Sequence, residues 1–192
     1  MAHIRTAILI SGTGSNMEAL IRAAEAPDYP AEIALVISNR PDAPGLAKAQ
    51  TLGVATLAID HTAYPDRASF ETAVHAALMD HRIELVALAG FMRVLTEGFV
   101  AKWAGRMINI HPSLLPRHKG LHTHRRALEA GDAEHGATVH WVTPELDSGG
   151  VIAQAGFPVA PGDTEDALRR KVQAVEHTLY PDALADACAT FP

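Results

Sequence analysis

The stretch Ala7-Ile8-Leu9-Ile10-Ser11-Gly12-Thr13-Gly14-Ser15-Asn16 decides the fold class. Its first four apolar residues predict a buried strand, and the glycine-rich turn leads into a helical pattern over residues 17–25. Glycines let the backbone turn sharply and come close to a ligand, while the N-terminus of a helix offers free N–H groups to an anion. The stretch therefore predicts the first strand–helix unit of an α/β domain, with a phosphate site between strand and helix.

The same alternation of strand and helix patterns continues along the chain. Further strands are expected at residues 33–37, 54–59, 85–89, 107–110, 137–142 and 151–155. Helical patterns start near residue 46 and cover residues 67–81, 99–103, 124–130 and 163–188, where Pro181 predicts a kink or a break. This order predicts an open, mostly parallel twisted sheet with helices on both faces, a Rossmann-like arrangement, in a single domain over residues 1–192. Ligands of such sheets bind at the carboxyl ends of the strands.

Composition and charge narrow the class of protein. The chain has 192 residues, of which 48% are hydrophobic, enough for a sizeable core, and its formal net charge is −6. That charge argues against a nucleic-acid-binding surface. The apolar runs are too short for a membrane span or a signal peptide, and Cys188, the only cysteine, excludes a disulfide within the chain. We therefore expect a cytoplasmic protein that binds neither nucleic acid nor membrane.

The glycine-rich turn departs from two known phosphate-binding motifs. A P-loop requires Gly-Lys-Ser/Thr, and no lysine is present in the turn. A dinucleotide fingerprint requires a third glycine where Met17 stands, and an acid after the second strand, where Ser38, Asn39 and Arg40 stand. Because Arg40 suits the 2′-phosphate of NADP, a nucleotide- or NADP-binding module remains an alternative, as does a plain strand–helix turn.

The densest chemistry lies in Asn109-Ile110-His111-Pro112-Ser113-Leu114-Leu115-Pro116. Asn109 and His111 end a strand two residues apart, so their side chains project to the same side. An amide donates to a developing oxyanion and an imidazole transfers protons near neutral pH, a combination that suits attack on a carbonyl carbon. Asp147, in a loop whose two glycines allow it to move as a lid, is a candidate partner for His111.

Two other interpretations of this region remain open. His111 is a structural histidine if its ring only hydrogen-bonds the loop. A metal site is the second alternative, because His118, His122 and His124 follow closely. The prolines and Gly120 exclude the helical spacing of zinc hydrolases, and no carboxylate or cysteine partner is evident, so we expect no metal.

Five runs of the sequence closely resemble one family, the phosphoribosylglycinamide formyltransferases. The runs span residues 11–16, 88–95, 109–116, 120–124 and 145–150. The resemblance implies a catalytic trio of Asn109, His111 and Asp147. It also implies that the ribonucleotide is bound by Gly14, Ser15, Asn16 and Glu176. It further implies that folate is bound by Arg67, Met92, Arg93, Val94 and Leu95.

The activity implied by this resemblance is transfer of a formyl group from 10-formyltetrahydrofolate to the amine of glycinamide ribonucleotide, in purine biosynthesis. The partners would be small-molecule substrates, with folate as co-substrate, no metal, and a monomer or homodimer as the assembly. A methionyl-tRNA formyltransferase would need a second, basic domain, and a formyltetrahydrofolate hydrolase usually carries an extra N-terminal domain. The sequence departs from relatives at Thr13, at Arg117-His118-Lys119 where others have Lys-aromatic-Pro, and in a shorter C-terminus.

Overall fold

A seven-stranded sheet organises the computed structural model, which describes residues 3–190. The strand order is β3-β2-β1-β4-β5-β6-β7. Five parallel strands are β1 (Ile4–Ile10), β2 (Ala31–Ser38), β3 (Thr56–Ala58), β4 (Leu85–Leu88) and β5 (Met107–His111). The antiparallel strands are β6 (Glu134–Trp141) and β7 (Val151–Pro158). The expected open, mostly parallel sheet is confirmed.

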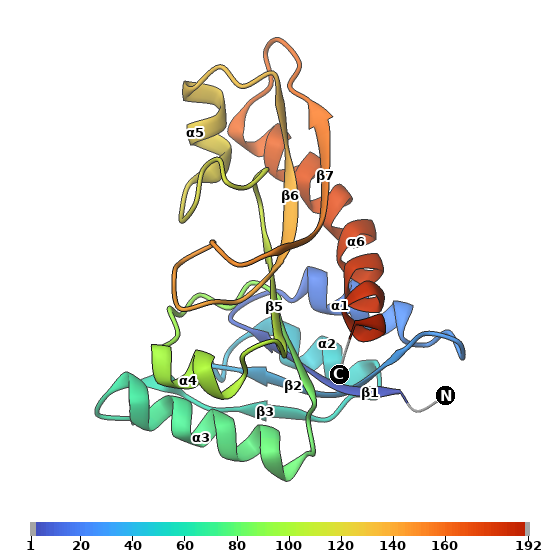
Figure 1. Cartoon of the computed structure of the whole chain (residues 1–192), viewed down its shortest axis with the longest axis vertical. Coiled ribbons are helices and arrows are strands. Elements are labelled where there is room, and N and C mark those ends of the chain that lie inside the picture. Colours follow the sequence, from blue (N-terminus) through green and yellow to red (C-terminus); the bar gives the residue numbers. More distant parts are fainter. Residues whose placement is uncertain (1–2, 191–192) are drawn as a thin grey trace.

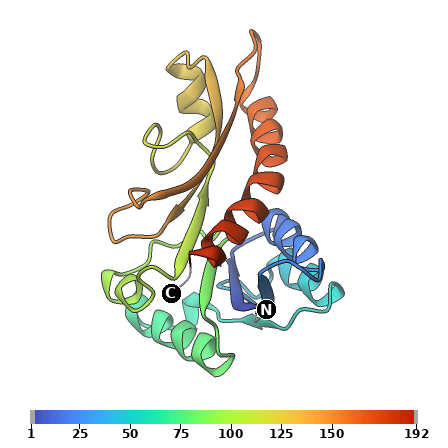
Figure 2. The ribbon, with the colours of Figure 1, turned by 45° about the vertical axis from the view of Figure 1, so that its right-hand side comes forward.

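Helices cover both faces of the parallel part of this sheet (Figures 1 and 2). On one face lie α1 (Ser15–Ala23), α2 (Pro44–Thr51) and the C-terminal half of α6 (Glu165–Ala189), packed against Ile8 and Ile10 of β1. On the other lie α3 (Arg67–Asp80) and α4 (Glu97–Lys102), packed against Ala7 and Leu9. Successive residues of β1 thus face opposite cores, which explains why residues 7–10 of this strand are all apolar.

The long C-terminal helix crosses from the upper hairpin of β6 and β7 down to the parallel sheet (Figure 1). The helix α6 runs through Pro181 to Ala189, so the expected break does not occur. Both views show α6 bending along its length, which is the usual effect of a proline inside a helix (Figures 1 and 2). The Pro181 carbonyl accepts a hydrogen bond from the Tyr29 hydroxyl at 2.7 Å, which ties the helix to the turn before β2. No described helix is long and apolar enough to cross a bilayer.

The topology determines where a ligand site lies. The chain proceeds from β1 to β2 and β3 on one side and then places β4 on the other side of β1. The loops after β1 and β4 therefore leave the sheet in different directions, and a crevice opens between them at the carboxyl ends of the strands. Between β5 and α5 (Thr123–Glu129) the chain is irregular, as Pro112, Pro116 and Gly120 predicted.

Candidate active site

Gly14 shapes the turn between β1 and α1. It is the N-cap of α1 and has a φ of 70°, in the left-handed region that favours glycine. A Cβ atom at this position would lie 2.9 Å from Cε of Met17. Ser15 and Asn16 then form the first residues of α1, where backbone N–H groups lack helical partners. The turn therefore has the geometry of an anion site at a helix N-terminus.

The Ser11 side chain joins three loops at this crevice. Its hydroxyl donates to Oδ1 of Asn39 at 2.6 Å and accepts a hydrogen bond from the Met92 N–H at 2.8 Å. The Ser11 N–H donates to the Gly90 carbonyl at 3.1 Å. Ser11 is buried, so these bonds hold the loops after β1, β2 and β4 in a fixed relation.

A pocket of about 470 Å³ lies between these loops. It brings together Gly14, Ser15 and Asn16 with Met92 and Arg93, which the sequence assigned to two different ligands. The same pocket is also lined by Asn39, Arg40 and His61. Each of them follows the end of a strand, and this position was the feature of the sequence that could have indicated a place in the pocket. The lining is therefore cationic and rich in hydrogen-bond donors, which suits an anionic ligand.

Glu176 meets Asn16 at the edge of this turn. The Asn16 side-chain amide donates to Oε2 of Glu176 at 2.9 Å, although 160 residues separate the two. Burial raises the pKa of the Glu176 carboxyl, and the hydrogen bond from Asn16 opposes that rise. Oδ1 of Asn16 is buried without a hydrogen-bond partner among the described residues. The pair thus presents an acceptor that a ligand donor can satisfy.

His111 lies at the end of β5 with both ring nitrogens facing oxygen atoms. Its Nδ1 is 3.4 Å from Oδ2 of Asp147, and its Nε2 is 2.9 Å from the carbonyl oxygen of His118. The side chains of His111 and Asp147 are nearly buried. A carbonyl oxygen only accepts, so Nε2 carries a proton, whereas Nδ1 has an ion-pair contact and no hydrogen bond to Asp147, which leaves an N–H on Nδ1 free to donate to a substrate. The geometry therefore suits a cationic His111 beside an anionic Asp147.

His140, which no sequence motif singled out, lies on β6 beside Asn109 in a register that pairs the two residues. His140 Nδ1 is 2.9 Å from the Trp141 carbonyl, and its Nε2 is 3.3 Å from Nδ2 of Asn109. A carbonyl only accepts, so Nδ1 carries the proton and Nε2 accepts from the Asn109 amide. Burial lowers the pKa of His140, against the opposing effects of Trp141 and Asp147, which agrees with a neutral ring. The sequence could have indicated this contact, because side chains alternate between the two faces along β6 and His140 lies on the face that Asn109 shares.

The Asp147 loop is held at both ends. Asp147 has a φ of 47°, and its carboxylate accepts a hydrogen bond from the Gly120 N–H at 2.8 Å. A Cβ atom on Gly149 would lie 1.7 Å from the Trp141 carbonyl oxygen, so only glycine fits there. The close packing of Gly149 on the end of β6 fixes the position of the loop, and in this position the Asp147 carboxylate lies beside His111.

The segment expected to bind folate follows β4. Met92 is 69% and Val94 is 60% exposed, whereas Leu95 is half-buried and packs against the core that includes Phe70. Nε of Arg93 is buried without a hydrogen-bond partner among the described residues. Arg67 is the exposed first residue of α3 and does not line the pocket of the glycine-rich turn. The segment thus offers apolar side chains and an unpaired cation to a ligand.

Two of the three histidines that suggested a metal site, His118 and His124, are engaged in separate pairs. His118 Nε2 is 2.6 Å from Oδ2 of Asp132, and His124 Nδ1 is 2.9 Å from Nε2 of His135. Within residues 3–190 no three His, Cys, Asp or Glu side chains form a group that could hold a metal ion. The expectation of no metal stays a prediction.

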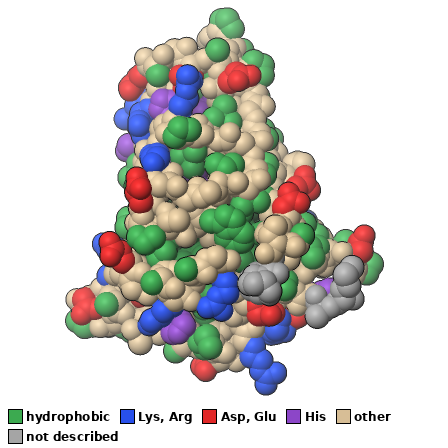
Figure 3. All heavy atoms as spheres, in the orientation of Figure 1, with side chains coloured by type: hydrophobic (Ala, Val, Ile, Leu, Met, Phe, Trp, Pro, Cys, Tyr) green, Lys and Arg blue, Asp and Glu red, His purple; other side chains and the backbone are tan. Residues whose placement is uncertain are grey.

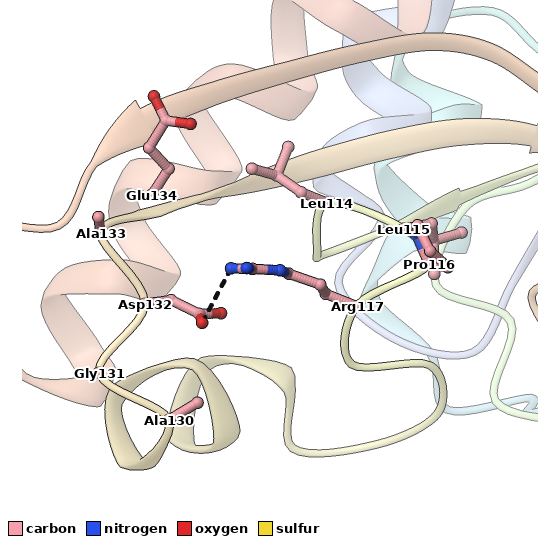
Figure 4. Close-up of a pocket in the computed structure, with 9 residues that line it drawn as sticks. All are labelled: Leu114, Leu115, Pro116, Arg117, Ala130, Gly131, Asp132, Ala133 and Glu134. Atoms are coloured by element: carbon pink, nitrogen blue, oxygen red, sulfur yellow. Dashed lines mark hydrogen bonds and ion pairs between the residues drawn. The ribbon is translucent and has the colours of Figure 1, made fainter.

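A second pocket, of about 620 Å³, lies on the outer side of the loop after β5 (Figure 4). The Arg117 side chain crosses it toward Asp132, in the turn between α5 and β6, and ends 3.0 Å from its carboxylate. Basic and histidine side chains gather over the neighbouring α5 in the space-filling view (Figure 3). This pocket contains none of the residues that the sequence assigned to a ligand.

Comparison with known proteins places these features in a family context. A family model described as formyl transferase matches residues 4–184. The chain is 47% identical over 174 residues to the phosphoribosylglycinamide formyltransferase of Escherichia coli (strain K12), covering 91% of this chain and 82% of that protein. A crystal structure of phosphoribosylglycinamide formyltransferase from Brucella melitensis superimposes with a TM-score of 0.94 at 48% identity, covering 99% of this chain and 98% of that one.

Longer proteins also contain a similar region. The chain is 48% identical over 181 residues to the trifunctional purine biosynthetic protein adenosine-3 of Gallus gallus. The matched region makes up 94% of this chain. Only 18% of that protein is matched, so this chain spans less than a fifth of the trifunctional relative.

Proposed function

Because the chain belongs to the formyl transferase family, we propose that it transfers a formyl group from 10-formyltetrahydrofolate to the amine of glycinamide ribonucleotide. The products would be formylglycinamide ribonucleotide and tetrahydrofolate, in a step of purine biosynthesis. Family membership implies a formyl-folate co-substrate. The choice of ribonucleotide as acceptor is supported by the names of the relatives and by the donor-rich pocket at the glycine turn.

The observation that carries the proposal is the cluster of Asn109, His111 and Asp147 at the end of β5. Attack of an amine on a formyl carbon places negative charge on the formyl oxygen. In the proposed reaction the Asn109 amide and the Nδ1–H of His111 donate to that oxygen, while Asp147 stabilises the positive charge of the ring. His140 occupies one N–H of the Asn109 amide and thereby orients the other toward the substrate. The attacking amine then loses a proton, the bond between the formyl carbon and the folate nitrogen breaks, and His111 or a water relays a proton to that leaving nitrogen, so no covalent bond to the protein is required.

The two substrates would bind to neighbouring loops, because the residues proposed for the ribonucleotide phosphate and two of those proposed for folate line one pocket. Gly14, Ser15 and Asn16 would hold the ribonucleotide phosphate at the N-terminus of α1, and Glu176 would accept a hydrogen bond from the ribonucleotide. The apolar side chains of Met92 and Val94 and the backbone around Leu95 suit a folate ring. The unpaired Arg93 suits a carboxylate of the folate tail, and Arg67 is proposed as a second cation for it.

Formyl transfer from 10-formyltetrahydrofolate, followed by folate absorbance, tests the proposal. We expect turnover of the purified chain to require glycinamide ribonucleotide and to collapse in His111→Ala. Turnover that proceeds equally without the ribonucleotide would assign water as the acceptor and identify a hydrolase. A folded protein without turnover in either case, with bound NADP detected by absorbance, would instead support a nucleotide-binding module.

A further inference from the structure

The loop after β5 supplies a backbone acceptor to His111. The Nε2 atom lies 2.9 Å from the main-chain oxygen of His118, seven residues further along the chain. An N–H on Nε2 is needed to make this bond, because a carbonyl oxygen can only accept. The bond therefore fixes the ring plane and directs Nδ1 toward Asp147 and the substrate side of the cluster.

The His118 carbonyl is itself held in an unusual backbone conformation. His118 has a φ of 53°, in the left-handed region that a residue with a Cβ atom adopts only when its surroundings favour it. Its imidazole Nε2 lies 2.6 Å from Oδ2 of Asp132, and both side chains are close to fully buried, at 13% and 10% exposed. The side chain is thus anchored on the side away from His111.

Asp132 is the anchor point for this part of the loop. Its other carboxylate oxygen accepts from Nη1 of Arg117 at 3.0 Å, in the outer pocket (Figure 4). Its backbone N–H donates to the Ala127 carbonyl at 3.0 Å, so the residue is tied to the end of α5. The Ser113 hydroxyl meanwhile donates to the Arg117 carbonyl at 2.6 Å. The backbone bond of Asp132 and the Ser113 hydroxyl leave the peptide of His118 little freedom to rotate, whereas the exposed ion pair with Arg117 adds little.

We infer that His118 and Asp132 are positioning residues for the proposed formyl transfer. The pair of side chains keeps the His118 carbonyl on Nε2 of His111, and that bond keeps Nδ1–H aimed at the reacting oxygen. The inference rests on the proposed function. The two side chains bond each other beside the outer pocket, which Asp132 lines, and His118 reaches His111 only through its carbonyl, so the pair acts through His111.

Loss of the anchor should lower kcat while leaving substrate binding intact. In His118→Phe the ring has no donor for Asp132, the peptide relaxes from its positive φ, and His111 can turn away from the productive orientation. Misplacement of a reacting group by about 1 Å can reduce the rate by about 10²-fold. We therefore expect kcat to fall roughly tenfold to a hundredfold, with KM for both substrates changed less than about twofold.

Two further variants separate positioning from general damage to the loop. His118→Gln restores an N–H donor for Asp132 and should recover most of kcat, whereas a kcat as low as that of His118→Phe would mean that the hydrogen bond to Asp132 does not position His111. Arg117→Gln removes only the outer ion pair, on a side chain that is 63% exposed, and should leave kcat unchanged. Equal losses in Arg117→Gln and His118→Phe, or an unchanged kcat in His118→Phe with normal melting, would overturn the inference.

Nitrogen-15 NMR of labelled histidine tests the same inference without substrates. The chain has 11 histidines, and His111→Gln identifies the signals of His111 by their loss. We expect Nε2 of His111 to give the shift of a protonated, hydrogen-bonded nitrogen in wild type and in His118→Gln, and to lose that signature in His118→Phe. Identical His111 spectra in all three would overturn the positioning role. A changed spectrum in a protein without formyl transfer would support the role and reject only the proposed function.

Discussion

Asn16 and Glu176 are joined by a hydrogen bond of 2.9 Å across the interface of α1 and α6. This bond brings a residue of the first turn of the first helix to a carboxylate in the last helix. It closes the edge of the proposed ribonucleotide site, since neither helix alone forms that edge. Because the Glu176 carboxyl is buried, the bond also links the site to the pH dependence of stability.

Glu176→Gln should weaken ribonucleotide binding and flatten the pH dependence of stability. Burial raises the pKa of Glu176 in the folded protein above its value near 4.5, so the wild type loses stability as pH rises from there through the raised pKa. The glutamine variant lacks this titration. We expect the melting temperature of the variant, relative to that of wild type, to rise as the pH is raised from about 4.5 to about 8. The KM for the ribonucleotide should rise about tenfold or more. A melting temperature that depends on pH in the same way in both proteins would contradict a raised pKa of Glu176 in the folded state.

Gly149→Ala should reduce activity through Asp147. The added Cβ would lie 1.7 Å from the Trp141 carbonyl oxygen, so the loop must move away from β6. We expect kcat to fall by about 10²-fold and the free energy of unfolding to fall by about 1–3 kcal/mol. Steady-state kinetics and urea unfolding measure the two effects.

Gly150→Ala is the matched control for Gly149→Ala. At Gly150 the nearest atom to an added Cβ is Cδ1 of Trp141 at 3.9 Å, an ordinary contact distance. The Gly150 variant should therefore resemble wild type in kcat and stability. Similar losses in both variants would mean that general stiffening of the loop, rather than the contact at Gly149, reduces activity.

Asn109→Ala removes the proposed oxyanion donor and takes the Asn109 amide away from Nε2 of His140, whose Nδ1 keeps its bond to the Trp141 carbonyl. Removal of one such donor typically costs about 10²–10³ in kcat. The KM values should change little, because the interaction forms in the transition state. Stopped-flow or steady-state assays report kcat, and the melting temperature checks that the variant is folded. A variant with wild-type kcat would exclude Asn109 from the reaction.

The pair of His124 and His135 should make the protein sensitive to mild acid. Burial lowers the pKa of His135 to about 4 and lowers that of His124, so the folded protein favours neutral rings joined by a 2.9 Å contact. Both groups take up protons more readily when unfolded, so stability is present above about pH 6.5 and is lost as pH falls toward about 4. The loss should be on the order of 2 kcal/mol.

Urea unfolding at pH 7 and pH 5 measures this effect. His135→Gln cannot titrate, so the difference in unfolding free energy between the two pH values should shrink in this variant, whatever its absolute stability. A variant that keeps the full pH difference would assign the acid sensitivity to other groups.

The strand and helix patterns sufficed for the fold class. Residues 7–10 carry apolar side chains on successive positions because β1 is covered on both faces, and this signal is local. Strand ends were harder to place. The sequence predicts one strand over residues 54–59, but only Thr56–Ala58 pairs with β2. The Val54 N–H instead donates to the Ala49 carbonyl near the end of α2. Pairing partners of this kind are set by neighbouring elements.

The sequence by itself determined the apolar strands, the glycine-rich turn at Gly14 and the side-by-side projection of Asn109 and His111, because each depends on the conformation of a few consecutive residues. Only the tertiary structure decided that Asp147 faces His111, that His140 lies beside Asn109 and that Glu176 meets Asn16. These contacts join residues that are far apart in the chain. Their physical basis is the pairing of β5 with the antiparallel β6 and the return of α6 to the parallel sheet, and neither leaves a periodic signal in the sequence.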